Sequence, residues 1–354
     1  MTRPWRAVAA LMAVALAAVF AGASAHAVDE TAINAAKPPR MLSQYGFFTD
    51  LAAQVPAGRV LPFEPSTQLF TDHARKMRFV YVPTGAAAVY GDREAFAFPV
   101  GSALVKTFAY PSVPGDPASP PRLIETRVLA RQSDGWAASA YVWNEEQTDA
   151  KLALAGKTLA LVATTEGGET VDVTYRVPNR NQCKGCHEVG GEVAPIGPKA
   201  RNLNHAFAYS DGPQNQIAGW ADAGILTAVP TLDSVPAMPD AFDPDAPLNA
   251  RARAWLDINC AHCHRADGPA SNSGLFLGWN VDDPVALGIG KRPVAAGRAA
   301  RGGTYDIEPG NPDASILLLR VESSEPGVMM PELGRSVTDD RAVELLREWI
   351  AQID

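Results

Sequence analysis

Two copies of one short motif, C-x-x-C-H, constrain this chain more than any other feature. The first copy is CKGCH at residues 183–187 and the second is CAHCH at residues 260–264. In such a motif the two thiols form thioethers with one haem, and the histidine binds its iron. The motifs therefore predict two covalently attached c-type haems, held by two sets of residues: Cys183, Cys186 and His187, and Cys260, Cys263 and His264.

Two other uses of paired cysteines compete with haem attachment. The pairs could close disulfides in an oxidising compartment, or all four thiolates could bind one zinc ion. Neither arrangement requires a histidine directly after the second cysteine in both copies. No cysteine lies outside the two motifs, so haem attachment is the favoured interpretation.

The first 27 residues have the pattern of a secretory signal peptide. Arg3 and Arg6 give a basic start, residues 7–22 are rich in Ala, Val and Leu, and AHA at 25–27 fits a cleavage site. An uncleaved membrane anchor is the alternative, because the apolar run is almost long enough to span a bilayer. The cleavage-like tripeptide favours removal of residues 1–27. We therefore expect a soluble, exported protein of the periplasm with no stable membrane span.

Composition excludes one class of partner. The 354-residue chain has 31 Lys and Arg against 39 Asp and Glu, which gives a formal net charge of −8. Proteins that bind nucleic acid through its phosphates usually carry a basic excess. No nucleic-acid partner is therefore expected.

The pattern of residues 28–180 predicts β-structure. Five runs are rich in Val, Thr, Phe and Tyr and are separated by turn sequences: 78–82, 103–110, 124–130, 137–143 and 170–177. Several short strands at such spacing indicate a sandwich or a barrel. We therefore expect an all-β N-terminal domain, sandwich- or barrel-like, over residues 28–180.

Downstream of this domain the apolar pattern becomes helical. Residues 248–259 carry apolar side chains on one helix face just before the second motif, and residues 339–353 do so after an acidic start. The expected fold class is α+β and multidomain. The β-rich domain is followed by two mainly helical cytochrome c-type haem modules, residues 181–247 and 248–354.

The order of features around the second motif resembles a class I cytochrome c domain. A helix leads into CAHCH, a long loop follows, and Met330-Pro331 precedes a terminal helix. In that family the terminal helices pack together, and the methionine before proline is the distal ligand of the iron. The resemblance implies that His264 is the proximal ligand and Met330 the distal one, with Met329 as the adjacent competitor.

The distal ligand of the first haem has three candidates. Met238-Pro239 repeats the Met-Pro pair downstream of the first motif, although Met238 also fits a plain proline-rich linker over residues 229–247. His205 is the second candidate, and an open iron position is the third. Met238 is the expected ligand, and the alternatives stay open at this point.

Nearly all of the chain after the signal resembles a more specific group, the exported dihaem c-type cytochromes of unassigned function with a β-rich N-terminal half. The matching stretches are FPVGSALVKTF (98–108), YVWNEEQTDA (141–150), VPNRNQCKGCH (177–187), IGPKARNLN (196–204), LDINCAHCH (256–264) and PGVMMPELGR (326–335). Members are often encoded beside an exported parallel β-helix protein. The resemblance implies redox partner proteins, including a β-helix protein of that kind, and implies no substrate.

Three functions are compatible with these expectations. The first is an exported dihaem cytochrome that transfers electrons between a donor and an acceptor, with no catalytic residue of its own. The second is a dihaem peroxidase or haem oxidoreductase whose β-rich domain binds substrate. The third is a haem-bearing docking module. We expect an electron carrier rather than an enzyme, because the first haem module is short for a full cytochrome domain.

A basic stretch without acids lies at residues 284–305 and contains Lys291, Arg292, Arg298 and Arg301. These cations could neutralise haem propionates or dock an acidic partner. They could equally form a solvated loop that balances an acidic protein. Both interpretations stay open at this point.

Overall fold

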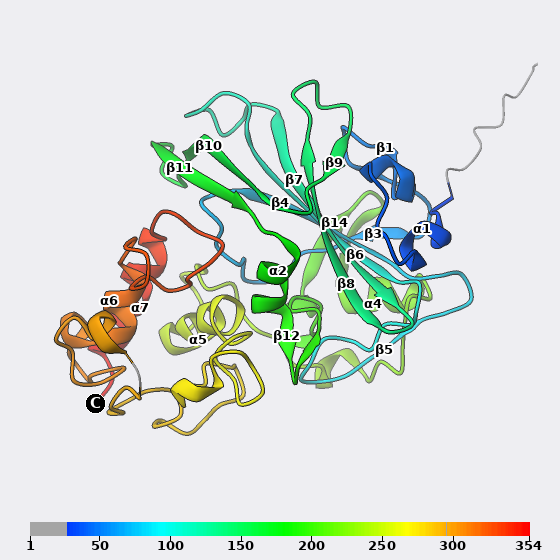
Figure 1. Cartoon of the computed structure of the whole chain (residues 1–354). Helices are drawn as coiled ribbons and strands as arrows, with labels where there is room; N and C mark the ends of the chain where they lie inside the picture. The colour runs from blue at the N-terminus through cyan, green and yellow to red at the C-terminus, as the bar shows by residue number, and fades with distance from the viewer. Residues whose placement is uncertain (1–26, 295) are drawn as a thin grey trace, which may run out of the picture.

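The computed structural model describes residues 27–294 and 296–354 of the chain. It mixes helices and strands, as the sequence predicted (Figure 1). The signal peptide expected at residues 1–27 lies outside the described residues, apart from Ala27. No helix in the described part is long and apolar enough to cross a membrane.

A six-stranded antiparallel sheet forms the centre of the N-terminal half. Four of the five strands expected from the sequence are confirmed in this sheet, and the fifth is β11 (Thr170–Val177). Within the described residues the edge strands β3 and β9 do not pair with each other, so the sheet is open and does not close into a barrel. The strand order is β3-β4-β6-β7-β8-β9, with bounds Val60–Pro62, Arg75–Tyr81, Ala103–Pro111, Pro121–Gln132, Gly135–Trp143 and Ala150–Leu152.

One face of the sheet is covered by the segment that precedes it. Side chains alternate between the two faces along a strand, and Val105 and Tyr141 point to this face. They pack with Ile33 of α1 (Glu30–Asn34) and with the 3₁₀ turn η1 (Leu42–Tyr45). This core lies entirely within the N-terminal half.

The opposite face is covered at its two ends and open between them. At one end the hairpin of β10 (Lys157–Thr164) and β11 packs Tyr175 against Phe108. At the other end Val80 of β4 is covered by apolar side chains from residues 200–226, a segment that includes two short helices. Between these clusters the face borders a cavity.

Residues 181–247 do not form the separate, mainly helical module expected from the sequence. Their Leu203 and Trp220 are buried in one cluster with Phe63 and Phe96 of the N-terminal half. A segment this short has too few apolar residues to enclose a core alone, so it folds onto the sheet. Its elements are α2 (Arg180–His187), β12 (Glu188–Val189), β13 (Glu192–Val193), α3 (Ala200–Leu203), β14 (Ala206–Tyr209), β15 (Gly212–Asn215), α4 (Gln216–Asp222), β16 (Leu226–Thr227) and the 3₁₀ turn η2 (Leu232–Ser234).

Short strand pairs complete the N-terminal half. Strand β1 (Phe48–Asp50) pairs with β2 (Val55–Pro56) in antiparallel fashion. Strand β5 (Ala88–Val89) pairs with β16 in parallel, through backbone hydrogen bonds that include Ala88 N to Ile225 O at 2.8 Å. The second pair further attaches residues 181–247 to the N-terminal half.

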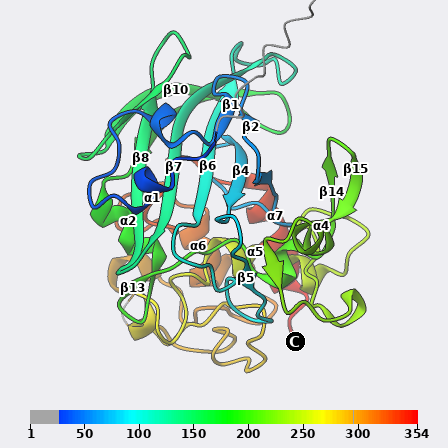
Figure 2. The same ribbon diagram turned by 90° about the vertical axis from the view of Figure 1, so that its right-hand side faces the viewer.

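The C-terminal third packs three helices into one core, which also contains Met238 and Ala241 of the preceding segment. Trp255 of α5 lies in one cluster with Leu318 of α6 and Leu346 of α7. Figure 2 shows these helices behind the strands of the sheet. The two helices expected from the sequence are confirmed, and α7 is slightly shorter than predicted. The elements are α5 (Leu248–Asn259), η3 (Ser271–Ser273), η4 (Gly297–Ala300), η5 (Pro312–Ala314), α6 (Ile316–Val321) and α7 (Asp340–Ala351).

Candidate functional site

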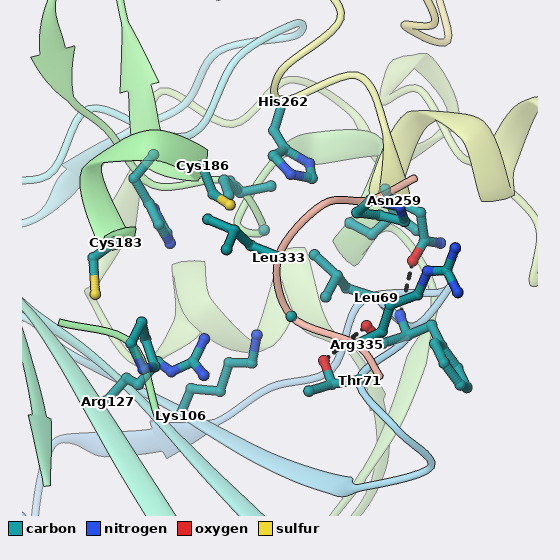
Figure 3. Close-up of a pocket in the computed structure, with 18 of the residues that line it drawn as sticks. Leu69, Thr71, Lys106, Arg127, Cys183, Cys186, Asn259, His262, Leu333 and Arg335 are labelled. Atoms are coloured by element: carbon teal, nitrogen blue, oxygen red, sulfur yellow. Dashed lines mark hydrogen bonds between the residues drawn. The ribbon is translucent and has the colours of Figure 1, made fainter. Parts of the chain in front are cut away.

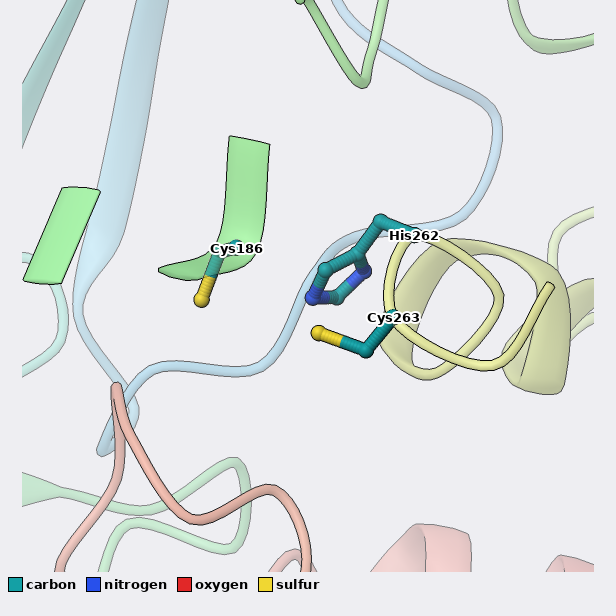
Figure 4. A group of neighbouring side chains, drawn as sticks. All are labelled: Cys186, His262 and Cys263. Atoms are coloured by element: carbon teal, nitrogen blue, oxygen red, sulfur yellow. The ribbon is translucent and has the colours of Figure 1, made fainter. Parts of the chain in front are cut away.

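The two C-x-x-C-H motifs, far apart in the sequence, lie next to each other in the fold. The first motif is part of α2, and the second follows the C-terminal end of α5. The Cys263 Sγ lies 3.8 Å from the carbonyl oxygen of Gly185. One ligand atom from each of Cys186, His262 and Cys263 lies within 4.8 Å of the other two (Figure 4). The fold therefore brings the two expected attachment sites together.

A capping box fixes where the helix of the first motif begins. The Asn179 side-chain oxygen accepts a hydrogen bond from Gln182 N at 3.0 Å, and the Gln182 side-chain oxygen accepts one from Asn179 N at 2.9 Å. Reciprocal bonds of this kind define the first residue of a helix. Residues three positions apart on a helix share a side, and both Cys183 and Cys186 face the same cavity.

The ring of His187 is oriented by a backbone carbonyl. Its Nδ1 donates a hydrogen bond to Ala194 O at 2.8 Å, just after the hairpin of β12 and β13. Burial lowers the pKa of His187 to about 4, so the ring is neutral at pH 7. With Nδ1 bonded in this way, Nε2 keeps a free lone pair, which is the usual state of a metal-binding imidazole.

His264 of the second motif is held in a similar but looser way. Its Nδ1 lies 3.3 Å from Ser273 Oγ, and burial lowers its pKa to about 4. Burial also raises the pKa of the Cys260 thiol to about 12. All four cysteines are free thiols, the state from which thioethers form.

A cavity of about 210 Å³ opens beside the first motif (Figure 3). Cys183, Cys186 and His187 contribute to its wall from α2, and His262 and Met330 contribute from the C-terminal third. The central sheet forms the opposite wall. The cavity therefore combines thiols, imidazoles and a thioether within a largely apolar lining, a donor set that fits a c-type haem.

His262 is a candidate site residue that sequence reasoning missed. Its side chain is only 8% exposed, and its Nδ1 has no hydrogen-bond partner among the described residues. A buried polar nitrogen without a partner costs free energy, and a bound metal would remove that cost. The only signal in the sequence was its position between Cys260 and Cys263.

The segment around Met330 is held in place by one arginine. The Arg335 guanidinium donates hydrogen bonds to Met330 O at 2.6 and 3.1 Å and to Val321 O at 3.0 Å. Met330 lines the cavity, and the neighbouring Met329 does not. This difference favours Met330 over Met329 as an iron ligand, a role that stays a prediction.

The expected ligands of the first haem lie elsewhere. Met238 is 4% exposed and packs in the C-terminal core with Trp255. His205 Nε2 lies 2.9 Å from Glu64 O. Neither residue lines the cavity beside His187. The structure thus does not bring them together with the first motif, which favours a different residue as the ligand of the first haem.

The chain matches no model of a known protein family, no curated protein and no solved structure. The resemblance to the dihaem cytochromes therefore depends on the motifs and stretches quoted from the sequence. The meeting of the two motifs beside one cavity is an independent observation, because nothing in their spacing along the chain requires it.

Proposed function

We propose that this chain is an exported dihaem c-type cytochrome that transfers electrons between a donor and an acceptor in the periplasm. One observation carries the proposal: two C-x-x-C-H motifs, distant in sequence, lie next to each other in the fold. The first motif and His262 of the second also line a cavity whose donor set fits haem. Haem attached there supplies a one-electron Fe(III)/Fe(II) couple. The residues of the chain provide the ligands, exclude water and set the local charge.

Each motif contributes two sulfur atoms and one imidazole. His187 and His264 each have Nδ1 close to a protein oxygen, which leaves Nε2 for the iron. For the first haem we propose His262 as the second protein ligand, because its buried nitrogen has no partner in the described part of the chain. For the second haem we propose Met330, because it matches the class I pattern. The cavity that Met330 lines is also lined by His262 of the second motif, but not by Cys260, Cys263 or His264.

The proposed domain organisation follows from the cores. Residues 248–354 would form a class I cytochrome c-like domain. In this region α5, which precedes the motif in the sequence, packs against α7, which follows Met330. Residues 28–180 would form the β-rich domain. Residues 181–247 would carry the first haem while sharing a core with the sheet.

The contact between the two motifs favours electron transfer from one haem to the other within the chain, referred to below as a relay. Cys186 and Cys263 belong to different motifs, and their sulfurs lie within 4.8 Å of each other. Two attached groups would therefore be neighbours, and an electron could pass between them without leaving the protein. The proposed partners are redox proteins of the periplasm, among them an exported parallel β-helix protein.

Covalent haem content tests this proposal. The full chain expressed with c-type haem maturation machinery should retain two haems after denaturation and acid–acetone extraction, and its mass should increase by two haems. Replacing Cys183 and Cys186 by Ala should remove one haem and leave the other. The matched control is the same chain produced without that machinery. Release of all haem on extraction would contradict the proposal.

A further inference from the structure

Three cations lie side by side on the sheet face that borders the cavity. In the antiparallel register Arg78 of β4 is directly opposite Lys106 of β6, and Lys106 is directly opposite Arg127 of β7. All three side chains line the cavity. Figure 3 shows Lys106 and Arg127 next to each other, with Cys183 and Cys186 across the cavity. These three residues are referred to below as the basic row.

The protein neutralises only part of this charge. Arg127 forms two hydrogen bonds with the Glu125 carboxylate, at 2.7 and 2.9 Å. Arg78 is 8% exposed, and it donates from Nη2 to the neutral Gln68 side chain at 2.8 Å. Its buried Nη1 has no partner, and Lys106 has no carboxylate partner within the described residues.

Such a row is costly without an anion. Like charges directly opposite each other on neighbouring strands destabilise a sheet, and a partly buried cation loses hydration. Burial, together with the charges of Arg78 and Arg127, lowers the pKa of Lys106 well below its usual range. Without an anion the position therefore favours a neutral side chain, and a bound anion would favour the charged lysine that the chain has there.

Three acids line the cavity: Asp72, Glu332 and Asp339. Glu332 is not among the charges that act on Lys106, and the other two are engaged elsewhere. The Asp72 carboxylate accepts hydrogen bonds from Ser336 N and Val337 N, at 2.6 and 3.0 Å. Asp339 accepts from Ala342 N at the start of α7 and from the Trp255 indole, both at 3.3 Å. Neither carboxylate is therefore free to balance the basic row.

We propose that Arg78, Lys106 and Arg127 form an anion site that binds a carboxylate group inside the cavity. Arg78 Nη1 and Lys106 Nζ supply charge-assisted hydrogen bonds, and Arg127, fixed by Glu125, adds positive potential. The carboxylate has two possible sources. One is a propionate of an attached haem, which rests on the proposed function, and the other is a free small carboxylate.

The basic stretch at residues 284–305 is a weaker candidate for this role. Lys291 Nζ lies 2.8 Å from Asp306 Oδ2, and Arg298 Nη1 lies 3.2 Å from Glu325 Oε1. These two cations already have carboxylate partners. The basic row, in contrast, has donors without partners and lies in the wall of the cavity itself.

The test compares Lys106→Gln with Lys157→Gln, whose lysine is exposed on β10. In the haem-loaded protein, we expect Lys106→Gln to lower the reduction potential of one haem, because losing a nearby positive charge stabilises Fe(III). Lys157→Gln should leave both potentials unchanged, and Lys106→Arg should restore the wild-type value. Redox titration followed by absorbance gives both potentials.

Titration with succinate distinguishes the two sources of carboxylate. If a propionate fills the site, succinate has no effect on the loaded wild-type protein. If the site takes a free carboxylate, succinate lowers one potential in a saturable way, because added negative charge stabilises Fe(III), and Lys106→Gln weakens its binding by about tenfold or more. Unchanged potentials in Lys106→Gln together with no succinate response in the wild type would overturn the proposal.

A failure of the proposed function gives a different result. If no haem is attached, the absorbance and the mass of the loaded preparation reveal it directly. The basic row is then tested in the full haem-free chain, where succinate should raise the midpoint of thermal unfolding in the wild type and in Lys157→Gln. An equal increase of the unfolding midpoint in Lys106→Gln, or no increase in the wild type, would overturn the proposal of a carboxylate site.

Discussion

His262 combines burial, an unpartnered nitrogen and a position at the junction of the two motifs. Its ring lies within 4.8 Å of both the Cys186 and Cys263 sulfurs. In the haem-loaded protein we expect His262→Ala to convert one low-spin haem to high spin, because its iron loses a nitrogen ligand. Absorption and electron paramagnetic resonance spectra would measure the change.

Two variants serve as controls for the His262 prediction. His205→Ala removes an imidazole that does not line the cavity, and Met238→Leu replaces a core thioether by a side chain of similar volume. Both should leave the spin state unchanged. A spin change in Met238→Leu, together with an unchanged His262→Ala spectrum, would make Met238 the ligand and the His262 proposal wrong.

Met330 is predicted to be a sulfur ligand of the second haem. Met330→Ala should abolish the near-infrared sulfur-to-iron band and lower the reduction potential of one haem, because a methionine ligand raises the potential. Met329→Ala is the matched control, since Met329 is buried but does not line the cavity. Survival of the band in Met330→Ala would move the assignment to another residue.

The site residues differ in how far the sequence could predict them. Cys183, Cys186 and His187 could be proposed from the sequence, because c-type haem attachment would require this spacing along the chain. His262 and Lys106 were not, because their roles depend on which distant segments meet in space. Lys106 lies within an ordinary strand pattern, and only the register with β4 and β7 reveals the two arginines beside it.

At the scale of elements, one buried ion pair connects α3 with α5. Arg201 donates to both Asp257 oxygens, with distances of 2.8 Å from Nη2 and 3.2 Å from Nε. Asp257→Asn leaves the arginine charge buried, so we expect it to lower the free energy of unfolding by about 3–5 kcal/mol. Urea unfolding would measure this, with the exposed Asp245→Asn as the control. A change as small as the control's would contradict the prediction.

The same pair predicts a pH dependence of stability. Burial alone would raise the pKa of Asp257, but Lys199 and Arg201 lower it overall below its ordinary value of 3.8. Its stabilising contribution is therefore complete above 3.8 and is lost as the pH falls through the lower pKa of the folded state. In Asp257→Asn this acid-dependent loss should be absent from unfolding curves recorded below pH 4.

Element prediction was most successful where the apolar pattern alone decides the structure. Four of the six strands of the central sheet, together with helices α5 and α7, form as expected from their apolar pattern, whereas the short edge strands β3 and β9 were not predicted. Residues 181–247 folded differently, because Leu203 and Trp220 find their apolar partners in the N-terminal half. No pattern within the segment identifies those partners.

At the scale of the whole molecule, the C-terminal third and the preceding part of the chain line one cavity and are joined by several hydrogen bonds and ion pairs. Asp72 of the N-terminal half binds the backbone of Ser336 and Val337, and Arg201 binds Asp257. Neither C-x-x-C-H motif therefore lies in an independent unit. If both motifs carry haem, as proposed, this arrangement would hold the two haems at a fixed separation.

Carbon monoxide binding distinguishes a relay from an enzyme for the whole molecule. A relay needs both irons to be fully coordinated by the protein, whereas a peroxidase needs one open position. We expect both reduced haems of the wild type to stay low-spin and to resist carbon monoxide, while His262→Ala binds it at one haem and serves as the positive control. Rapid binding by the wild type, together with peroxide turnover from a reduced donor, would reject the relay and favour a dihaem peroxidase.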